Sequence, residues 1–217
     1  MYKLIVGPLK YGRRNGYDAQ RYWGDRLGKH GMSLDGPGDE GIDEKANRLE
    51  YEEATRRLGE LCSQKGVEFA RLAVAEIGVG TGFYTGWLRR AGVTRYVGMD
   101  ITDVLFPRLR ELYPDYRFLR KDVTRDPIDG TFDLILMMDV IEHIVTESDL
   151  ARAMQNIKIA VSRTGFFILS GVRSRTRKNL FYEHSWSVED VRQHFAGWCC
   201  EGPFPYRGNH LLIIRKA

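Results

Sequence analysis

One short stretch of the sequence decides the fold: LAVAEIGVGTG, at residues 72–82. Residues 72–77 form an apolar run with the length of a buried strand, and three glycines follow within the next five positions. Glycine in such a turn permits a positive φ and lets a ligand approach the backbone more closely than a Cβ would allow. The stretch therefore predicts a strand, a glycine-rich turn, and a helix over about 84–91.

Strand and helix patterns alternate along the chain after this stretch. Further strands are expected at 95–99, 116–119, 132–138 and 165–170, with helices at 102–112 and 148–160. Ser187, with Asp190 three residues later, is expected to cap a helix that ends near Gly197. Two closing strands, around 198–201 and 210–215, would form a terminal antiparallel hairpin. Repeated β-α units of this kind predict a single α/β domain with a doubly wound, mostly parallel sheet.

The N-terminal third has a different pattern. Residues 11–43 combine glycine, arginine, aspartate and aromatic residues without a sustained period, and 35–39 is expected to be a loop. Residues 42–63 have the apolar spacing of a helix. We expect one domain in which 1–66 form a helical N-terminal region and 67–217 form the α/β core.

Composition narrows the class of protein. The 217 residues are 43% hydrophobic and 29% charged, with a net charge of +4, as in an ordinary globular domain. This mildly basic balance would suit an anionic ligand, and it makes a dedicated nucleic-acid binder unlikely. The three cysteines have neither disulfide nor metal spacing, and no apolar run approaches the ~20 residues of a membrane span. A cytoplasmic location is therefore expected.

The spacing of the glycines points to a class of cofactor. A dinucleotide fingerprint has the order G-x-G-x-x-G, whereas here the third glycine, Gly82, comes one residue early and Phe83 follows it. Glu76, two residues before the first glycine, suits a ligand with an ammonium group better than one with a pyrophosphate. The turn is therefore expected to suit a ligand whose amino-acid part carries an ammonium group rather than a dinucleotide.

Acidic residues end the next two strands. Asp100 follows YVGM at 96–99, where a carboxylate can accept hydrogen bonds from both hydroxyls of a ribose. Asp122 follows FLRK at 118–121, where it can accept from the exocyclic amine of adenine. Either residue alone is more often a solvated helix cap. Their occurrence at consecutive strand ends favours a nucleoside site.

Together, EIGVGTG, YVGMD, LRKDV and FDLILMMDVIEHI resemble the motifs of class I S-adenosylmethionine-dependent methyltransferases, a family with a Rossmann-like fold, over about 71–214. The resemblance implies S-adenosyl-L-methionine as the cofactor and a helical N-terminal lid over the site. It also implies roles for particular residues. The methionine and ribose part would lie against Glu76, Gly78, Gly80 and Gly82, the ribose and adenine against Asp100, Ile101, Asp122 and Val123, and the methionine end against Met138 and Asp139.

The segment after the fourth strand supplies candidates for catalysis. In one helical turn, Asp139, Glu142 and His143 would share a face. They are expected to act as a general base or to shape the loop. Relatives that use a similar Glu-His pair with a divalent metal carry glutamate at the position of Asp139, so no metal is predicted. His184, after the basic run at 173–178, is the alternative base.

Several functions remain open at this stage. The first is O-methylation of a small-molecule acceptor, which an anionic group on the acceptor would suit. Transfer to a peptide, protein or RNA end is the second. No Asn/Asp-Pro-Pro-Tyr/Phe motif follows the fourth strand, which argues against methylation of base or glutamine amino groups. A non-catalytic, cofactor-binding subunit of a complex is the alternative of another class.

Overall fold

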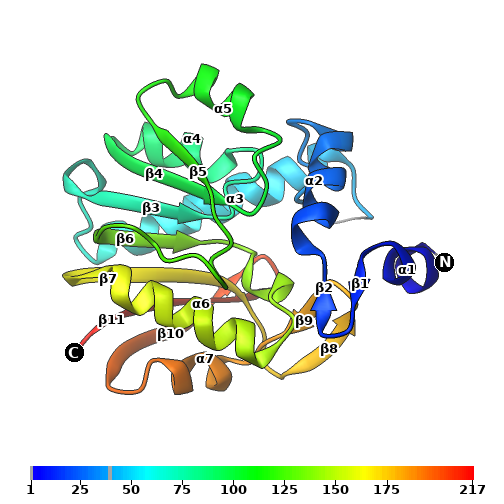
Figure 1. Ribbon diagram of the computed structural model, residues 1–217. Coiled ribbons are helices and arrows are strands. Elements are labelled where there is room, and N and C mark those ends of the chain that lie inside the picture. Colours follow the sequence, from blue (N-terminus) through cyan, green and yellow to red (C-terminus); the bar gives the residue numbers. More distant parts are fainter. Residues whose placement is uncertain (1, 39–40) are drawn as a thin grey trace.

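The computed structural model describes residues 2–38 and 41–217. Its centre is a seven-stranded sheet in the order β10-β11-β7-β6-β3-β4-β5 (Figure 1). The five strands β3 to β7 are parallel, while β11 runs antiparallel to β7 and β10 antiparallel to β11. The predicted doubly wound sheet with a closing hairpin is confirmed. The strands are β3 (Ala73–Ile77), β4 (Arg95–Asp100), β5 (Arg117–Arg120), β6 (Phe132–Met137), β7 (Val161–Val172), β10 (Trp198–Tyr206) and β11 (Asn209–Lys216).

Helices cover both faces of the sheet, and the alternation of side chains along the strands explains why. In β6, Leu134 and Leu136 pack into one hydrophobic cluster while Ile135 and Met137 pack into the other. The first cluster includes α3 (Glu44–Gln64), α4 (Phe83–Arg90) and α5 (Phe106–Leu112). The second includes α6 (Glu147–Ala160) and α7 (Val188–His194). Each face of the sheet is therefore buried under its own layer of helices.

Side-chain N-caps mark the first residues of several helices. Asp43 and Thr146 each accept a hydrogen bond from a backbone N–H in the first turn of α3 and α6, and Ser187 forms a capping box with Asp190. One predicted start is wrong: α5 begins at Phe106 rather than at 102. The N–H of Thr102 is bound to the Asp100 carboxylate, which holds residues 100–102 in a turn before the helix.

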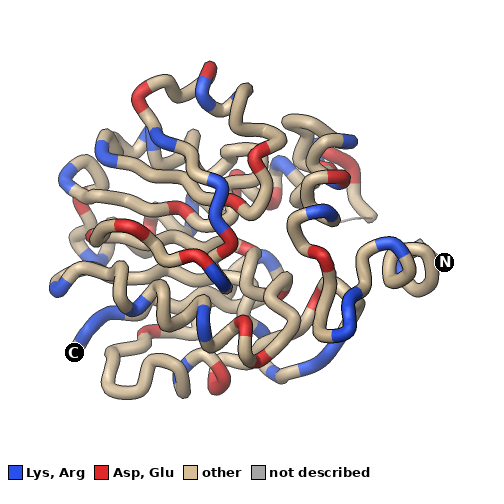
Figure 2. The backbone as a smooth tube through the Cα atoms, viewed as in Figure 1, with Lys and Arg blue, Asp and Glu red and all other residues tan. Residues whose placement is uncertain are grey.

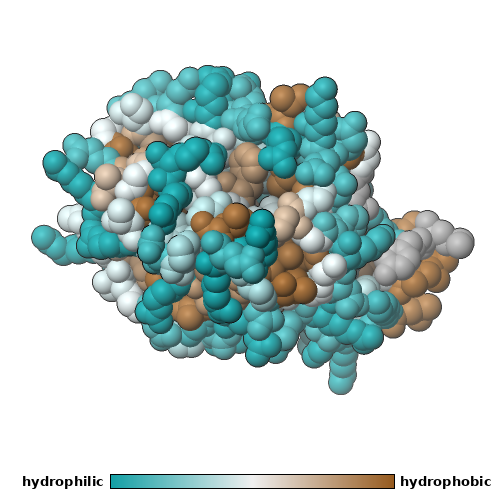
Figure 3. All heavy atoms as spheres, turned by 90° about the horizontal axis from the view of Figure 1, so that it is seen from above, coloured by the Kyte–Doolittle hydropathy of each residue, from teal (hydrophilic) through white to brown (hydrophobic). Residues whose placement is uncertain are grey.

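The part of the N-terminal region that precedes α3 lies across the carboxyl edge of the parallel strands (Figure 1). It comprises η1 (Tyr2–Val6), α1 (Gly7–Tyr11), β1 (Gly12–Arg13), β2 (Gly16–Tyr17) and α2 (Ala19–His30). Leu27 of α2 and Tyr51 of α3 belong to the same cluster as the sheet, so both helices pack on the core. A division of the chain at residue 66 stays a prediction. Exposed apolar side chains, Leu4 and Leu9 among them, gather at the projecting end of the molecule (Figure 3).

The segment between β7 and α7 forms a small antiparallel hairpin. β8 (Arg177–Leu180) pairs with β9 (Glu183–Ser185), and Lys178 lies opposite His184. Basic residues recur in β8 and just before it (Figure 2). At the turn of this hairpin, Tyr182 stacks on Tyr22 of α2 with ring centroids 4.7 Å apart. The hairpin thus packs against the N-terminal region.

Two short 3-10 helices complete the fold, η2 (Phe69–Arg71) and η3 (Ile141–His143). Residue 39 of the predicted loop at 35–39 lies outside the described residues. Cys62, Cys199 and Cys200 are free thiols. Over the described ranges, no helix has both the length and the apolar character needed to span a bilayer.

Candidate active site

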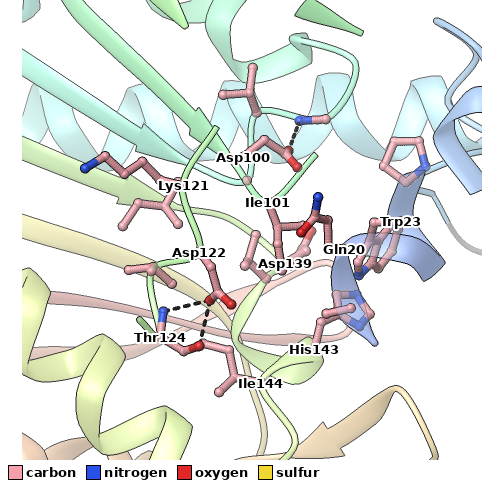
Figure 4. Close-up of a pocket in the computed structure, with 18 of the residues that line it drawn as sticks. Gln20, Trp23, Asp100, Ile101, Lys121, Asp122, Thr124, Asp139, His143 and Ile144 are labelled. Carbon is pink, nitrogen blue, oxygen red and sulfur yellow. Dashed lines mark hydrogen bonds between the residues drawn. The ribbon is translucent and has the colours of Figure 1, made fainter. Parts of the chain in front are cut away.

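A cavity of about 260 Å³ opens at the carboxyl edge of the parallel strands, where β3 lies between β4 and β6 (Figure 4). This is the switch point of the strand order, where doubly wound sheets bind their ligands. The loops after β3, β4, β5 and β6 form its floor, and β2 and α2 form its opposite wall. Of the predicted site residues, those on the cavity wall are Gly78, Gly80, Asp100, Ile101, Asp122, Val123, Met138, Asp139 and His143.

The three glycines after β3 have different surroundings, although all three have positive φ angles of 78°, 51° and 77°. A Cβ on Gly78 would lie 2.2 Å from Cγ2 of Val140, and one on Gly82 would lie 2.5 Å from Cδ2 of Leu109. At Gly80 the nearest atom, the Cβ of Pro37, is 3.8 Å away. Gly78 and Gly82 are thus demanded by packing, whereas the space above Gly80 belongs to the cavity. Gly82 is not part of the cavity wall.

Asp100 is held by the backbone around it. Its Oδ2 accepts from the N–H of Gly80 at 2.9 Å, and its Oδ1 accepts from the N–H of Thr102 at 3.1 Å. The residue is buried, and this burial raises the pKa of its carboxyl group above the ordinary value. Each oxygen has a further lone pair, so the carboxylate can still accept from a ligand.

Asp122 lies at the neighbouring strand end and is likewise oriented locally. Its Oδ1 accepts from both the N–H and the hydroxyl of Thr124, at 3.0 and 2.6 Å (Figure 4). Val123 and Ile101 line the cavity beside the two aspartates. The structure therefore brings the two predicted acidic strand ends to one wall of one cavity.

Glu76 lies behind the cavity rather than on its wall. Its Oε2 accepts from the hydroxyls of Thr85, at 2.8 Å, and Tyr96, at 2.5 Å, on the side of the sheet covered by α4. Its Oε1 has no hydrogen-bond partner among the described residues. Complete burial raises the pKa of Glu76 to about 7.

Asp139 follows β6 in the left-handed backbone region, with φ of 53°. Its N–H donates to the Ser170 hydroxyl at 2.9 Å, and that hydroxyl lies 2.9 Å from Oδ1. Its Oδ2 is 2.5 Å from Nη1 of Arg207, a residue in the turn between β10 and β11. Nothing in the sequence pattern had indicated Arg207, because 68 residues separate it from Asp139.

Glu142 and His143 lie on η3 but face different surroundings. The Glu142 carboxyl is buried against Gly171, and it does not line the cavity. Burial, together with the Asp139 charge, raises the pKa of Glu142 well above its ordinary value. His143 is on the cavity wall, its Nδ1 is 3.0 Å from the carbonyl oxygen of Tyr182, and burial lowers its pKa. Of the three residues expected to share one face, only Asp139 and His143 line the cavity, whereas Glu142 points away from it.

His184 is not on the cavity wall. Its ring packs against that of Trp186 at a tilt of 32°, with centroids 4.0 Å apart, and neither ring nitrogen has a hydrogen-bond partner among the described residues. Pairing of β8 with β9 fixes this position, opposite Lys178. The described part of the chain contains no group of three histidine, cysteine or acidic side chains able to hold a metal ion.

The opposite wall comes from the N-terminal region, which had been expected to be a lid. Tyr17 donates to the carbonyl oxygen of His143 and accepts from Nε1 of Trp23, both at 3.2 Å. Gln20 and Trp23 point toward the cavity from α2 (Figure 4). Tyr51 and Tyr84 also line the cavity and were missed. Tyr84 is the second residue after the glycine-rich turn, so its position in the first turn of α4 was a usable signal.

Comparison with known proteins gives a family match for part of the chain. Residues 75–169 match the family described as a methyltransferase domain. An alignment of 131 positions, which covers 55% of this chain, shows 25% identity to a highly reducing polyketide synthase of Aspergillus terreus and spans 5% of that protein. The chain is thus a small fraction of the length of that protein.

Solved structures share the fold at low identity. The magnesium protoporphyrin IX methyltransferase of Synechocystis, with bound S-adenosylhomocysteine, superposes with a TM-score of 0.71 at 17% identity, over 91% of this chain and 98% of that one. The complex of DhpI with the same ligand superposes with a TM-score of 0.66 at 15% identity, over 90% of this chain and 93% of DhpI. The glycopeptide N-methyltransferase MtfA, also in complex with S-adenosylhomocysteine, superposes with a TM-score of 0.59 at 13% identity, over 74% of this chain and 88% of that one. Residues 75–169 thus match the methyltransferase-domain family, and the chain shares the Rossmann-like fold of solved methyltransferases that bind S-adenosylmethionine or S-adenosylhomocysteine.

Proposed function

We propose that this methyltransferase transfers the methyl group to a hydroxyl of a small-molecule acceptor, with His143 as the general base. The contact between Nδ1 of His143 and the Tyr182 carbonyl carries the proposal. A carbonyl oxygen only accepts, so Nδ1 must bear the hydrogen and Nε2 keeps its lone pair. Since burial lowers the pKa of His143, the ring is neutral near pH 7 and able to take a proton.

The placement of the cofactor is part of the same proposal. S-adenosylmethionine supplies an activated methyl group on a positively charged sulfur. The open space above Gly80 fits a ligand that approaches the backbone closely. Asp100 and Ile101 would hold the ribose side, and Asp122 with Val123 the adenine. The methionine part would then lie toward Gly80, Met138 and Asp139. In this arrangement Glu76 and Gly82 support the turn from behind.

The N-terminal region also contributes to catalysis in this proposal, because it encloses His143. Trp23 packs on the His143 ring with centroids 4.6 Å apart, and Tyr17 holds the His143 carbonyl. These contacts hold His143 in place and cover one side of its ring. Alignment of the acceptor with the methyl group supplies the remaining acceleration.

The test compares three variants on a panel of small phenols, alcohols, carboxylates and amines. His143→Gln and His143→Ala should lower transfer to hydroxyl acceptors by roughly 10²–10⁴-fold and leave the affinity for S-adenosylhomocysteine unchanged. His184→Ala is the matched control and should keep full activity. Carboxylate acceptors need no deprotonation near pH 7, so their methylation should survive loss of His143. Undiminished hydroxyl methylation by His143→Ala, or activity toward amines alone, would refute the proposal.

A further inference from the structure

Two residues other than glycine have a positive φ in the described part of the chain, and they bind each other. Asp139 has φ of 53° and Arg207 has φ of 41°, and Oδ2 of the first is 2.5 Å from Nη1 of the second. Backbone strain of this kind persists only where surrounding contacts hold it, and it concentrates at functional sites. The ion pair therefore warrants a role beyond ordinary surface charge.

The turn between β10 and β11 reaches the cavity through two neighbouring residues. Tyr206 shares a hydrogen bond with the hydroxyl of Tyr84. Arg207 binds Asp139 and places its guanidinium 4.0 Å from the ring centre of Tyr51. Tyr51, Tyr84 and Asp139 all line the cavity, together with Gly80. The tip of the C-terminal hairpin thus supports three side chains of the cavity wall from outside.

The Asp139 carboxylate is fixed at both oxygens. Arg207 holds Oδ2, and the Ser170 hydroxyl lies 2.9 Å from Oδ1. The Arg207 side chain is only 7% exposed, so water screens this pair weakly. A carboxylate held in this way presents its remaining lone pairs in a fixed direction, which favours the binding of an ammonium group.

We propose that Arg207 is a positioning residue for the methionine part of the cofactor, acting through Asp139 and Tyr51. The inference rests on the cofactor placement proposed above. Asp139 accepts from the ammonium group of the methionine part, and Arg207 keeps the Asp139 carboxylate and the Tyr51 ring in place. Arg207 itself does not line the cavity.

Two ligands separate this role from a contribution to folding alone. S-adenosylhomocysteine has the amino-acid part, whereas 5′-methylthioadenosine has the same adenosine and sulfur without it. Arg207→Gln should weaken binding of S-adenosylhomocysteine about tenfold or more, while binding of 5′-methylthioadenosine changes less than about twofold, both by calorimetry. Arg207→Lys keeps the charge without the planar fork and should recover part of the loss. Arg215→Gln is the matched control, because it removes an exposed ion pair with Glu201 on the same hairpin.

The double variant tests whether Arg207 acts through Asp139. Asp139→Asn with Arg207→Gln should bind S-adenosylhomocysteine no worse than the weaker single variant. Wild-type affinity in Arg207→Gln, or an equal loss of both ligands, would overturn the inference. If Arg207→Gln does not fold, the two-ligand comparison on Arg207→Lys decides. Failure of the wild-type protein to bind either ligand would instead refute the proposed cofactor placement.

Discussion

The N–H of Gly80 donates a hydrogen bond of 2.9 Å to Oδ2 of Asp100. This bond joins the glycine-rich turn after β3 to the end of β4, and the N–H of Thr102 binds the other carboxylate oxygen. The carboxylate is therefore oriented by the fold itself before a ligand arrives. It must also stay an acceptor at both oxygens, since both of these partners are donors.

Replacement of Asp100 by asparagine should damage both folding and binding. The amide nitrogen would face a backbone N–H, so we expect a loss of about 1–3 kcal/mol in the free energy of unfolding. Affinity for S-adenosylhomocysteine should fall by about 2–3 kcal/mol. Urea unfolding and calorimetry measure the two effects. Asp103→Asn, at an exposed position nearby, should change neither. Unchanged affinity in folded Asp100→Asn would show that the ribose lies elsewhere.

Glu76 should make the stability of the protein depend on pH. Its pKa of about 7 in the folded state lies above the ordinary value of 4.5 for a glutamate. As pH rises from about 4.5 to 7, the unfolded chain loses this proton while the folded chain keeps it, so stability falls over this window. The whole effect is of the order of 3 kcal/mol. Glu76→Gln keeps an acceptor for Thr85 and Tyr96 and should lose this contribution. Identical pH profiles of wild type and Glu76→Gln in denaturant unfolding would contradict the assignment.

The position of Glu76 also shows what the sequence allowed us to predict. Parallel strand ends meet at one edge, so the positions of Asp100 and Asp122 followed from the strands alone. Glu76 was expected on the cavity wall. However, it is two residues from Val74 in β3 and therefore points to the same face of the sheet, where Val74 packs into the cluster under α3 and α4. Strict alternation would have assigned it to that face.

Other parts of the site depended on contacts between distant segments. His184 is placed by the pairing of β8 with β9, and its register follows from a hairpin that the basic run did not indicate. Arg207 reaches Asp139 only because β11 lies beside β7. Sheet order of this kind leaves no local pattern in the sequence. The residues that form the end of the cavity near Tyr51 therefore could not be predicted from the sequence.

The pH dependence of turnover should report His143. A base must be neutral, and burial lowers the pKa of His143 below its ordinary value of 6.5. As pH falls, turnover of a hydroxyl acceptor should therefore reach half of its plateau only below pH 6.5, as the ring becomes protonated. The measurement is kcat against pH at saturating acceptor and cofactor. A midpoint above pH 6.5 would point to a different base.

Alanine substitutions at the three glycines of the turn should distinguish effects on folding from effects on cofactor binding. Gly78→Ala places a Cβ 2.2 Å from Val140 and should lower the free energy of unfolding by at least about 2 kcal/mol. Gly82→Ala places a Cβ 2.5 Å from Cδ2 of Leu109, which is fully buried in the core, so it should cost a similar amount.

Gly80→Ala has room for its methyl group, because the nearest atom is 3.8 Å away, and should cost only about 1–2 kcal/mol for its left-handed backbone. That methyl group projects into the space assigned to the cofactor. We therefore expect folded Gly80→Ala to lose S-adenosylhomocysteine affinity by about tenfold or more. Folded Gly82→Ala, away from the cavity wall, should keep it. Calorimetry on the folded fraction of each variant decides, and the reverse order of affinities would mean that the cofactor does not pass over Gly80.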